Sequence, residues 1–354
     1  MSETTPEQKQ PRLTRAEHIV AVKGGGYFPV LILLQDGSLG AVVRGGAPHI
    51  GVKGRLDWIH SQDGGRTWSA PATIVDSQWD DRNPALGQMP DGTIALGYGE
   101  CSHYEPDGKW NQEVGQFDLY YVLSKDNGRT WSPKQPLDSG PIRHSRSPYG
   151  RIIVLPDRAA LMTVYGARTD EPESADRLVP GGRYYAGLIR SRDNGRTWGD
   201  FSFLGANLNE TSLGHLPDGR LLAFARTDEG GSVWEAESRD LGYSWTGWQR
   251  VTQPKQHPAD VTLLQSGHLL LTYGNRIEPF GAQCMLSRDG GKTWDRDRRT
   301  MVGWTSLHGD CGYPSTVQLR DGTIVTIYYS VGTRDLPDDE QAIVVRYAEE
   351  MIGR

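Results

Sequence analysis

Cysteine is scarce in this chain, and the common metal and nucleotide motifs are missing. Its 354 residues include 3 cysteines, and Cys101, Cys284 and Cys311 are too few and too scattered for a disulfide framework or a cysteine-type zinc site. No His-Glu-x-x-His, Cys-x-x-Cys or phosphate-binding loop occurs. We therefore expect no cofactor and no metal.

An excess of positive charge and long apolar runs are also absent. The 38 Lys and Arg against 44 Asp and Glu give a formal net charge of −6, which argues against a nucleic-acid surface. No apolar run approaches a membrane-spanning length, and the polar opening MSETTPEQKQPR is unlike a signal peptide. We expect no nucleic-acid or membrane partner, and a protein that is cytoplasmic or exported with its signal removed. The oligomeric state and the compartment stay open.

One eight-residue pattern, Ser-x-Asp-x-Gly-x-Thr/Ser-Trp, recurs five times. The copies begin at Ser61, Ser124, Ser191, Ser238 and Ser287. A spacing of about 45 to 65 residues is typical of repeat architectures, in which each repeat is one supersecondary unit. Asp and Ser/Thr side chains bind the amides of tight turns, and glycine permits positive φ. We interpret these aspartates as turn formers that take no part in catalysis.

A second repeat alternates with the first and predicts six four-stranded units. Each unit has an apolar strand, a two-residue hairpin turn, a second apolar strand, a variable loop and a third strand, and the octet then leads into a fourth strand. The turns lie at Asp36, Asp91, Asp157, Asp218, Ser266 and Asp321. The sixth unit lacks an octet, so we expect residues 17–23 to supply its outer strand and close the ring. We expect residues 1–16 to form a disordered tail and residues 17–354 to form a single all-β domain.

Aligning the units on their turns nominates residues for one common centre. The positions eight residues before each turn are Phe28, Asn83, Tyr149, Glu210, Pro258 and Tyr313. Eight residues after the first and fourth turns lie Arg44 and Arg226. Antiparallel order places all these positions on the face that carries the long loops, where function is expected. Asp310 also flanks this centre, whereas for Arg82 we favour a solvated surface position.

These motifs resemble the sialidase (neuraminidase) superfamily. The octet is similar to its Asp-box, or BNR repeat, which implies a six-bladed β-propeller. Asn209-Glu210-Thr211, followed by Arg226, resembles one active-site block, and Tyr313-Pro-Ser-Thr-Val-Gln-Leu resembles the block that carries the nucleophile. The resemblance implies Tyr313 as nucleophile, Glu210 as its base, and Arg226 and Arg276 as ligands of an acidic sugar.

The first unit departs from the family pattern. Phe28 stands where sialidases carry an arginine, and counting back from the first octet places His49 where they carry the acid/base aspartate. Imidazole can serve as acid or base, so His49 is the third catalytic candidate, with Asp57 as the alternative. Arg44 could replace the missing arginine. Phe28, Asn83 and Tyr149 complete the expected substrate-binding set.

The sequence favours a retaining exo-glycosidase that acts on an acidic sugar such as sialic acid. Two alternatives remain open. The first is a uronate polysaccharide lyase, in which histidine and tyrosine move protons. The second is a non-catalytic propeller that binds glycans. In each case the expected partner is a carbohydrate.

Overall fold

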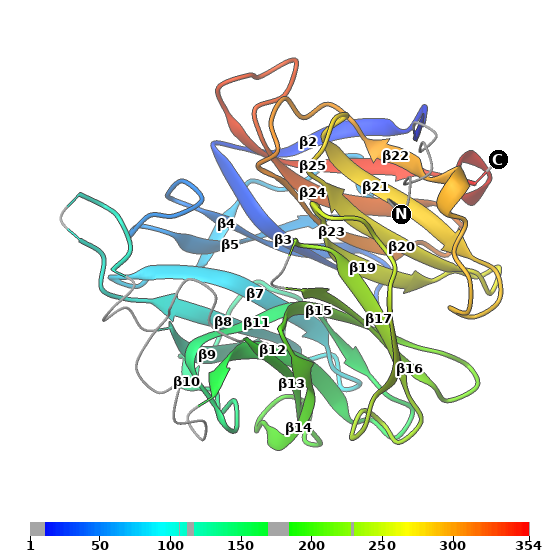
Figure 1. Cartoon of the computed structure of the whole chain (residues 1–354). Coiled ribbons are helices and arrows are strands. Elements are labelled where there is room, and N and C mark those ends of the chain that lie inside the picture. Colours follow the sequence, from blue (N-terminus) through cyan, green and yellow to red (C-terminus); the bar gives the residue numbers. More distant parts are fainter. Residues whose placement is uncertain (1–10, 106, 112–116, 169–183, 228–229, 354) are drawn as a thin grey trace, which may run out of the picture.

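The computed structural model describes residues 11–105, 107–111, 117–168, 184–227 and 230–353. Within them the chain forms strands and two short 3₁₀ turns, Arg296–Arg298 and Glu349–Met351. Sheets of antiparallel strands follow one another along the chain and surround a common centre (Figure 1). This all-β architecture is consistent with a β-propeller.

The strands group as consecutive antiparallel sets. The first set is β3 (Gly25–Leu33), β4 (Leu39–Gly45), β5 (Arg55–Ser61) and β6 (Ala72–Val75). The second is β7 (Asp80–Gln88), β8 (Ile94–Cys101), β9 (Phe117–Ser124) and β10 (Gln135–Pro136). The third is β11 (Ile142–Val154), β12 (Ala160–Arg168), β13 (Tyr185–Ser191) and β14 (Gly199–Ala206). A short parallel pairing of β7 with β11 joins the second and third sets into one eight-stranded sheet.

The later sets follow the same order. The fourth is β15 (Leu208–His215), β16 (Leu221–Thr227), β17 (Val233–Ser238) and β18 (Thr246–Arg250). The fifth is β19 (Gln256–Leu263), β20 (Leu269–Asn275), β21 (Gly281–Ser287) and β22 (Thr300–Gly303), with β1 (Arg12–Leu13) at its outer edge. The last is β23 (Cys311–Gln318), β24 (Ile324–Val331), β25 (Glu340–Tyr347) and β2 (Glu17–Lys23).

The first strands of these sets line the centre of the molecule. Each contacts the next, from β3 through β7, β11, β15 and β19 to β23, and β23 contacts β3 again. Buried apolar clusters fill the spaces between neighbouring sheets; Leu31, Val43 and Ile59, for example, pack against Val325 and Val344. Burial of apolar side chains between the sheets therefore stabilises the closed ring, and polar side chains remain at its centre.

The N-terminal strand pairs with the last strands of the chain, as the sequence predicted. β2 is antiparallel to β25, with Glu17 opposite Arg346 and Lys23 opposite Gln341. The expected disordered tail needs a correction. Arg12 and Leu13 pair in parallel with Thr300 and Met301, because the otherwise unpaired edge of β22 offers backbone hydrogen-bond partners. Residues 1–10 lie outside the described residues.

The five octets form the same turn. In the first, the Ser61 hydroxyl accepts a hydrogen bond from the Gly65 amide, while Asp63 accepts bonds from the amide and hydroxyl of Thr67. The equivalent serine–glycine bond recurs in the other four copies. These turns join the third and fourth strands of the first five sets, as predicted, and their carboxylates accept hydrogen bonds from the turn itself.

Candidate active site

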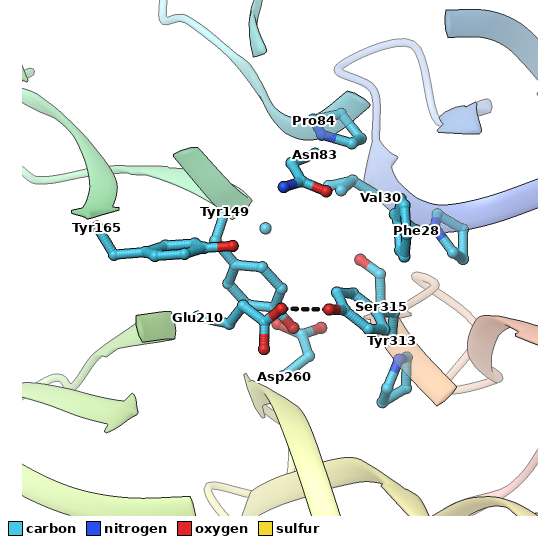
Figure 2. A pocket seen from close by; sticks show the side chains of 13 residues that line it. Phe28, Val30, Asn83, Pro84, Tyr149, Tyr165, Glu210, Asp260, Tyr313 and Ser315 are labelled. Atoms are coloured by element: carbon cyan, nitrogen blue, oxygen red, sulfur yellow. Dashed lines mark hydrogen bonds between the residues drawn. The ribbon is translucent and has the colours of Figure 1, made fainter. Parts of the chain in front are cut away.

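The backbone of the first strands turns the nominated residues toward the centre. The antiparallel register shifts at Phe28, Asn83, Glu210 and Tyr313, which are the bulge positions of β3, β7, β15 and β23. Phe28, Asn83 and Tyr313 have φ of 51°, 52° and 50°, a region that non-glycine residues rarely adopt. Bulges re-aim side chains and are frequent beside active sites. Figure 2 shows these side chains around one space.

Tyr313 and Glu210 face each other from opposite sides of that space. The Tyr313 hydroxyl donates a hydrogen bond to Glu210 Oε1, which Figure 2 marks. Arg226 donates to the other carboxylate oxygen over 2.8 Å. Burial raises the pKa of Glu210, but the Arg226 charge and the Tyr313 bond outweigh it and hold that pKa below its usual value. Burial and the neighbouring Glu210 carboxylate raise the pKa of Tyr313. The resting pair is therefore a phenol beside a carboxylate.

Three arginines at this centre have buried N–H groups without partners among the described residues. These groups are Nε of Arg82, Nε of Arg226, and Nε and Nη2 of Arg276. Arg276 lies with its Cζ 5.8 Å from the centroid of the Tyr313 ring. Burial, together with the Arg226 and Arg276 charges, lowers the pKa of His257 to about 3, so this neighbouring ring is neutral. Guanidinium groups with unpaired donors beside a polar centre are suited to an anionic ligand.

Arg82 and Arg44 differ from the roles expected for them: Arg82 lies at the centre, and Arg44 is bound within the protein. The Arg82 Cζ lies 5.2 Å from the centroid of the Phe28 ring, and Nη1 donates a hydrogen bond to Asp80. Arg44 is fully buried, and it donates to Asp80 and to the carbonyls of Ala47, Pro48 and Gly51. Arg44 therefore anchors the loop before β5, and its bonded guanidinium does not fit the expected role of substrate ligand. The sequence signal for Arg82 was its position next to the bulge residue Asn83.

His49 lies on this loop and reaches the same centre. Its Nδ1 is 2.9 and 3.1 Å from the two carboxylate oxygens of Asp310, and the Tyr329 hydroxyl donates to Asp310 over 2.6 Å. Its ring meets the Phe28 ring edge-on at 5.1 Å, and the Phe28 ring is 4.9 Å from that of Tyr313. Asp57, the alternative acid, is buried in β5, where it accepts hydrogen bonds from Arg55 and Thr73, a position that does not fit an acid/base.

The remaining predicted residues line a small cavity beside Tyr313. It measures about 10 Å³, room for about one water molecule, and Phe28, Asn83 and Tyr149 contribute to its wall. The Asn83 side chain donates to Ser147, and the Tyr149 hydroxyl donates to the Ala259 carbonyl. The Asn83 side-chain nitrogen and the Tyr149 hydroxyl thus already have protein partners, which favours a supporting role for both residues.

Within the described ranges, no three His, Cys, Asp or Glu side chains gather as they would around a metal ion. The same part of the chain contains no helix long and apolar enough to cross a membrane.

A ring of antiparallel sheets with a phenol, a carboxylate and guanidinium groups at its centre defines a propeller-type protein with a polar central site. The profile of the BNR repeat-like domain matches residues 41–326. The chain belongs to this family, within the sialidase superfamily.

Curated relatives include a sialidase of Clostridium perfringens and one of Paraclostridium sordellii. The first is 26% identical over 241 residues, 62% of this chain and 60% of that protein. The second is 25% identical over 244 residues, 62% of this chain and 57% of that protein. The matched region therefore spans about three fifths of these relatives.

Solved structures show the same fold. A protein of unknown function from Dyadobacter fermentans superposes with a TM-score of 0.78 at 22% identity, covering 93% of this chain and 97% of that one. A Hadza microbial sialidase has a TM-score of 0.71 at 19% identity, with 93% and 66% covered. An alpha-L-arabinanase of Penicillium chrysogenum has a TM-score of 0.64 at 14% identity, with 95% and 100% covered. At these identities the likeness concerns the fold alone.

Proposed function

We propose that this chain is a six-bladed propeller enzyme, a retaining exo-glycosidase that acts on an acidic sugar. Tyr313 is the nucleophile, Glu210 is its base, and His49 is the acid/base. Membership in the sialidase superfamily supports glycoside chemistry. The sugar itself is proposed from the charges at the site.

The hydrogen bond from Tyr313 to Glu210 carries this proposal. A phenol attacks poorly while it is protonated, and burial raises the pKa of Tyr313, so the attack needs a base within reach. Glu210, kept ionised by Arg226, accepts the proton as the bond from the Tyr313 oxygen to the anomeric carbon forms. A neutral nucleophile suits a sugar whose carboxylate lies beside the anomeric carbon, because an attacking carboxylate would be repelled.

The unpaired guanidinium donors of Arg82, Arg226 and Arg276 bind the sugar carboxylate in this scheme. Arg82 approaches from β7, whereas the arginine that sialidases carry in the first unit is replaced here by Phe28. The anion site therefore differs in shape from the family pattern. We expect slow cleavage of simple sialosides and faster cleavage of another acidic glycoside.

His49 completes the proposed reaction. Its protonated ring gives a proton to the leaving-group oxygen while the glycosidic bond breaks. It then takes a proton from the water that cleaves the tyrosyl–sugar bond, which restores free Tyr313 and retains the anomeric configuration.

A panel of 4-nitrophenyl glycosides of neutral and acidic sugars, together with acidic polysaccharides monitored in the ultraviolet, tests the proposal. We expect release of 4-nitrophenol from an acidic glycoside, loss of turnover in Tyr313→Phe, and normal turnover in the control Tyr120→Phe, whose ring lies over Lys134. An unsaturated, ultraviolet-absorbing product would instead identify a lyase. Binding without turnover would identify a glycan-binding propeller.

His49→Ala tests the role of the acid separately. The variant should lose activity on substrates with poor leaving groups and keep activity on 4-nitrophenyl glycosides, whose leaving group needs little protonation. Equal losses on both kinds of substrate would place the acid/base elsewhere.

A further inference from the structure

The contact between His49 and Asp310 has the geometry of an oriented acid/base pair. The histidine comes from the loop after β4 and the aspartate from the residue before β23, so 261 residues separate them in sequence. Nδ1 lies within hydrogen-bond distance of both carboxylate oxygens, at 2.9 and 3.1 Å. The Tyr329 hydroxyl donates to the same carboxylate. Asp310 thus accepts from two side chains at the rim of the proposed site.

The charge of Asp310 determines which nitrogen of His49 holds a proton. Burial raises the pKa of this carboxyl, but the bonds from His49 and Tyr329 and the Arg276 charge outweigh it, so its pKa lies below the usual value. An ionised carboxylate only accepts hydrogen bonds, and therefore Nδ1 must be the donor. In the neutral imidazole the lone pair is then on Nε2. Nε2 makes no hydrogen bond with a described residue.

Aromatic packing restricts the ring further. Phe28 meets the His49 ring edge-on at 5.1 Å, and Tyr27 and Tyr329 lie at 5.6 and 6.2 Å. An arginine in place of Phe28 would put a second cation against the imidazolium and repel it. The two departures in the first unit, Phe28 and His49, are therefore physically linked, because an apolar residue at 28 permits a histidine at 49.

We propose that Asp310 is the positioning residue of the acid/base: it holds His49 in the Nδ1–H form, so that Nε2 exchanges protons with the leaving group and with water. This inference rests on the proposed glycosidase function. In the first step the Nε2 proton passes to the glycosidic oxygen as that oxygen takes the electron pair of the breaking bond. In the second step Nε2 receives a proton from water as the water oxygen bonds to the anomeric carbon. The Tyr313–sugar bond breaks with its electron pair on the Tyr313 oxygen, and Glu210 returns the proton to that oxygen. Asp310 stays ionised throughout and gains no proton.

The histidine tautomer can be measured without any substrate. Long-range ¹H–¹⁵N spectra of the full chain distinguish Nδ1–H from Nε2–H imidazole, and the signal missing from His49→Gln assigns the residue. We expect Nδ1–H in the wild type and in the exposed control Asp338→Asn, and a change toward Nε2–H in Asp310→Asn. An Nε2–H wild type would overturn the inference, whether or not Asp310→Asn folds. An unchanged tautomer in a folded Asp310→Asn would also overturn it.

Leaving-group dependence provides the catalytic test. On the acidic glycoside that the panel identifies, Asp310→Asn should lower kcat for the methyl glycoside by about 10²-fold or more and for the 4-nitrophenyl glycoside by less than about 5-fold, as expected for a weakened general acid. A purely structural role predicts equal losses on both, and that result would overturn the proposal. If no glycoside is cleaved although the tautomer is Nδ1–H, the proposed function fails and the positioning of His49 by Asp310 stands.

Discussion

Glu235 should make the stability of this protein fall as pH rises toward neutrality. This carboxylate is buried in β17, where it accepts a hydrogen bond from the Trp294 indole over 2.8 Å. In the other four octets the tryptophan donates to a glycine carbonyl of its own turn. Burial outweighs the Trp294 bond and raises the pKa of Glu235 from 4.5 to about 7. The folded state therefore retains a proton that the unfolded chain has already released.

The size of the effect follows from these two pKa values. Between pH 4.5 and about 7 the folded state binds more protons, so the free energy of unfolding decreases as pH rises. The full contribution, present below pH 4.5 and lost above pH 7, is about 3 kcal/mol. At about 2.1 cal/mol/K of unfolding entropy per residue over 354 residues, this corresponds to about 4 °C in melting temperature.

Glu235→Gln removes the titrating group and keeps an acceptor for Trp294. We compare melting temperatures at pH 4.5 and pH 8. Relative to the wild type, the melting temperature of the variant should be about 4 °C higher at pH 8 than at pH 4.5. Glu237→Gln is the matched control. Glu237 lies on the same strand, and its hydrogen bond with Arg220 lowers its pKa, so this carboxyl titrates below the range between pH 4.5 and about 7. If the wild type and Glu235→Gln changed in parallel between the two pH values, the reasoning would be refuted.

Three further predictions concern the site and the closure of the ring. Tyr313→Phe and Glu210→Gln should each lower kcat by at least about 10²-fold with unchanged circular dichroism, since both changes conserve volume; near-normal turnover in either variant contradicts the proposed mechanism. Arg276→Met should lower kcat/KM for an acidic glycoside by about 10- to 100-fold without lowering the melting temperature, because two of its buried N–H groups have no partner; unchanged kcat/KM would remove it from the anion site. Deleting residues 1–24 exposes the edge of β25 and should reduce solubility or melting temperature; an unchanged melting curve would show that β2 is dispensable.

Much of the fold could be predicted because it repeats. The octets and the hairpin turns divide the chain into similar units, and the unit that lacked an outer strand predicted the pairing of β2 with β25. Position within the unit also brought Glu210 and Tyr313 to the centre, although they are 103 residues apart. A repeated pattern fixes which positions share a face, since each strand alternates its side chains in the same way.

The contacts of individual side chains could not be predicted in this way. Arg44 and Arg82 both lie near the centre, and only the structure shows that Asp80 and three loop carbonyls take up Arg44 while Arg82 extends over Phe28. The pairing of His49 with Asp310 joins a loop of the first unit to the start of the last, a contact that no spacing specifies. Long charged side chains bind partners on neighbouring sheets. Which partner they bind depends on loop conformation, which leaves no periodic signal in the sequence.

The most direct test of the account is covalent trapping at Tyr313. The full chain is incubated with fluorinated glycosyl fluorides of several acidic sugars, which form a glycosyl–enzyme that hydrolyses slowly, and the adduct is located by peptide mass spectrometry. We predict one added sugar on the peptide that contains Tyr313, and none in Tyr313→Phe. A sugar attached to another residue, or turnover with inversion at the anomeric carbon and no adduct, would contradict the proposal that Tyr313 is the nucleophile of a retaining glycosidase.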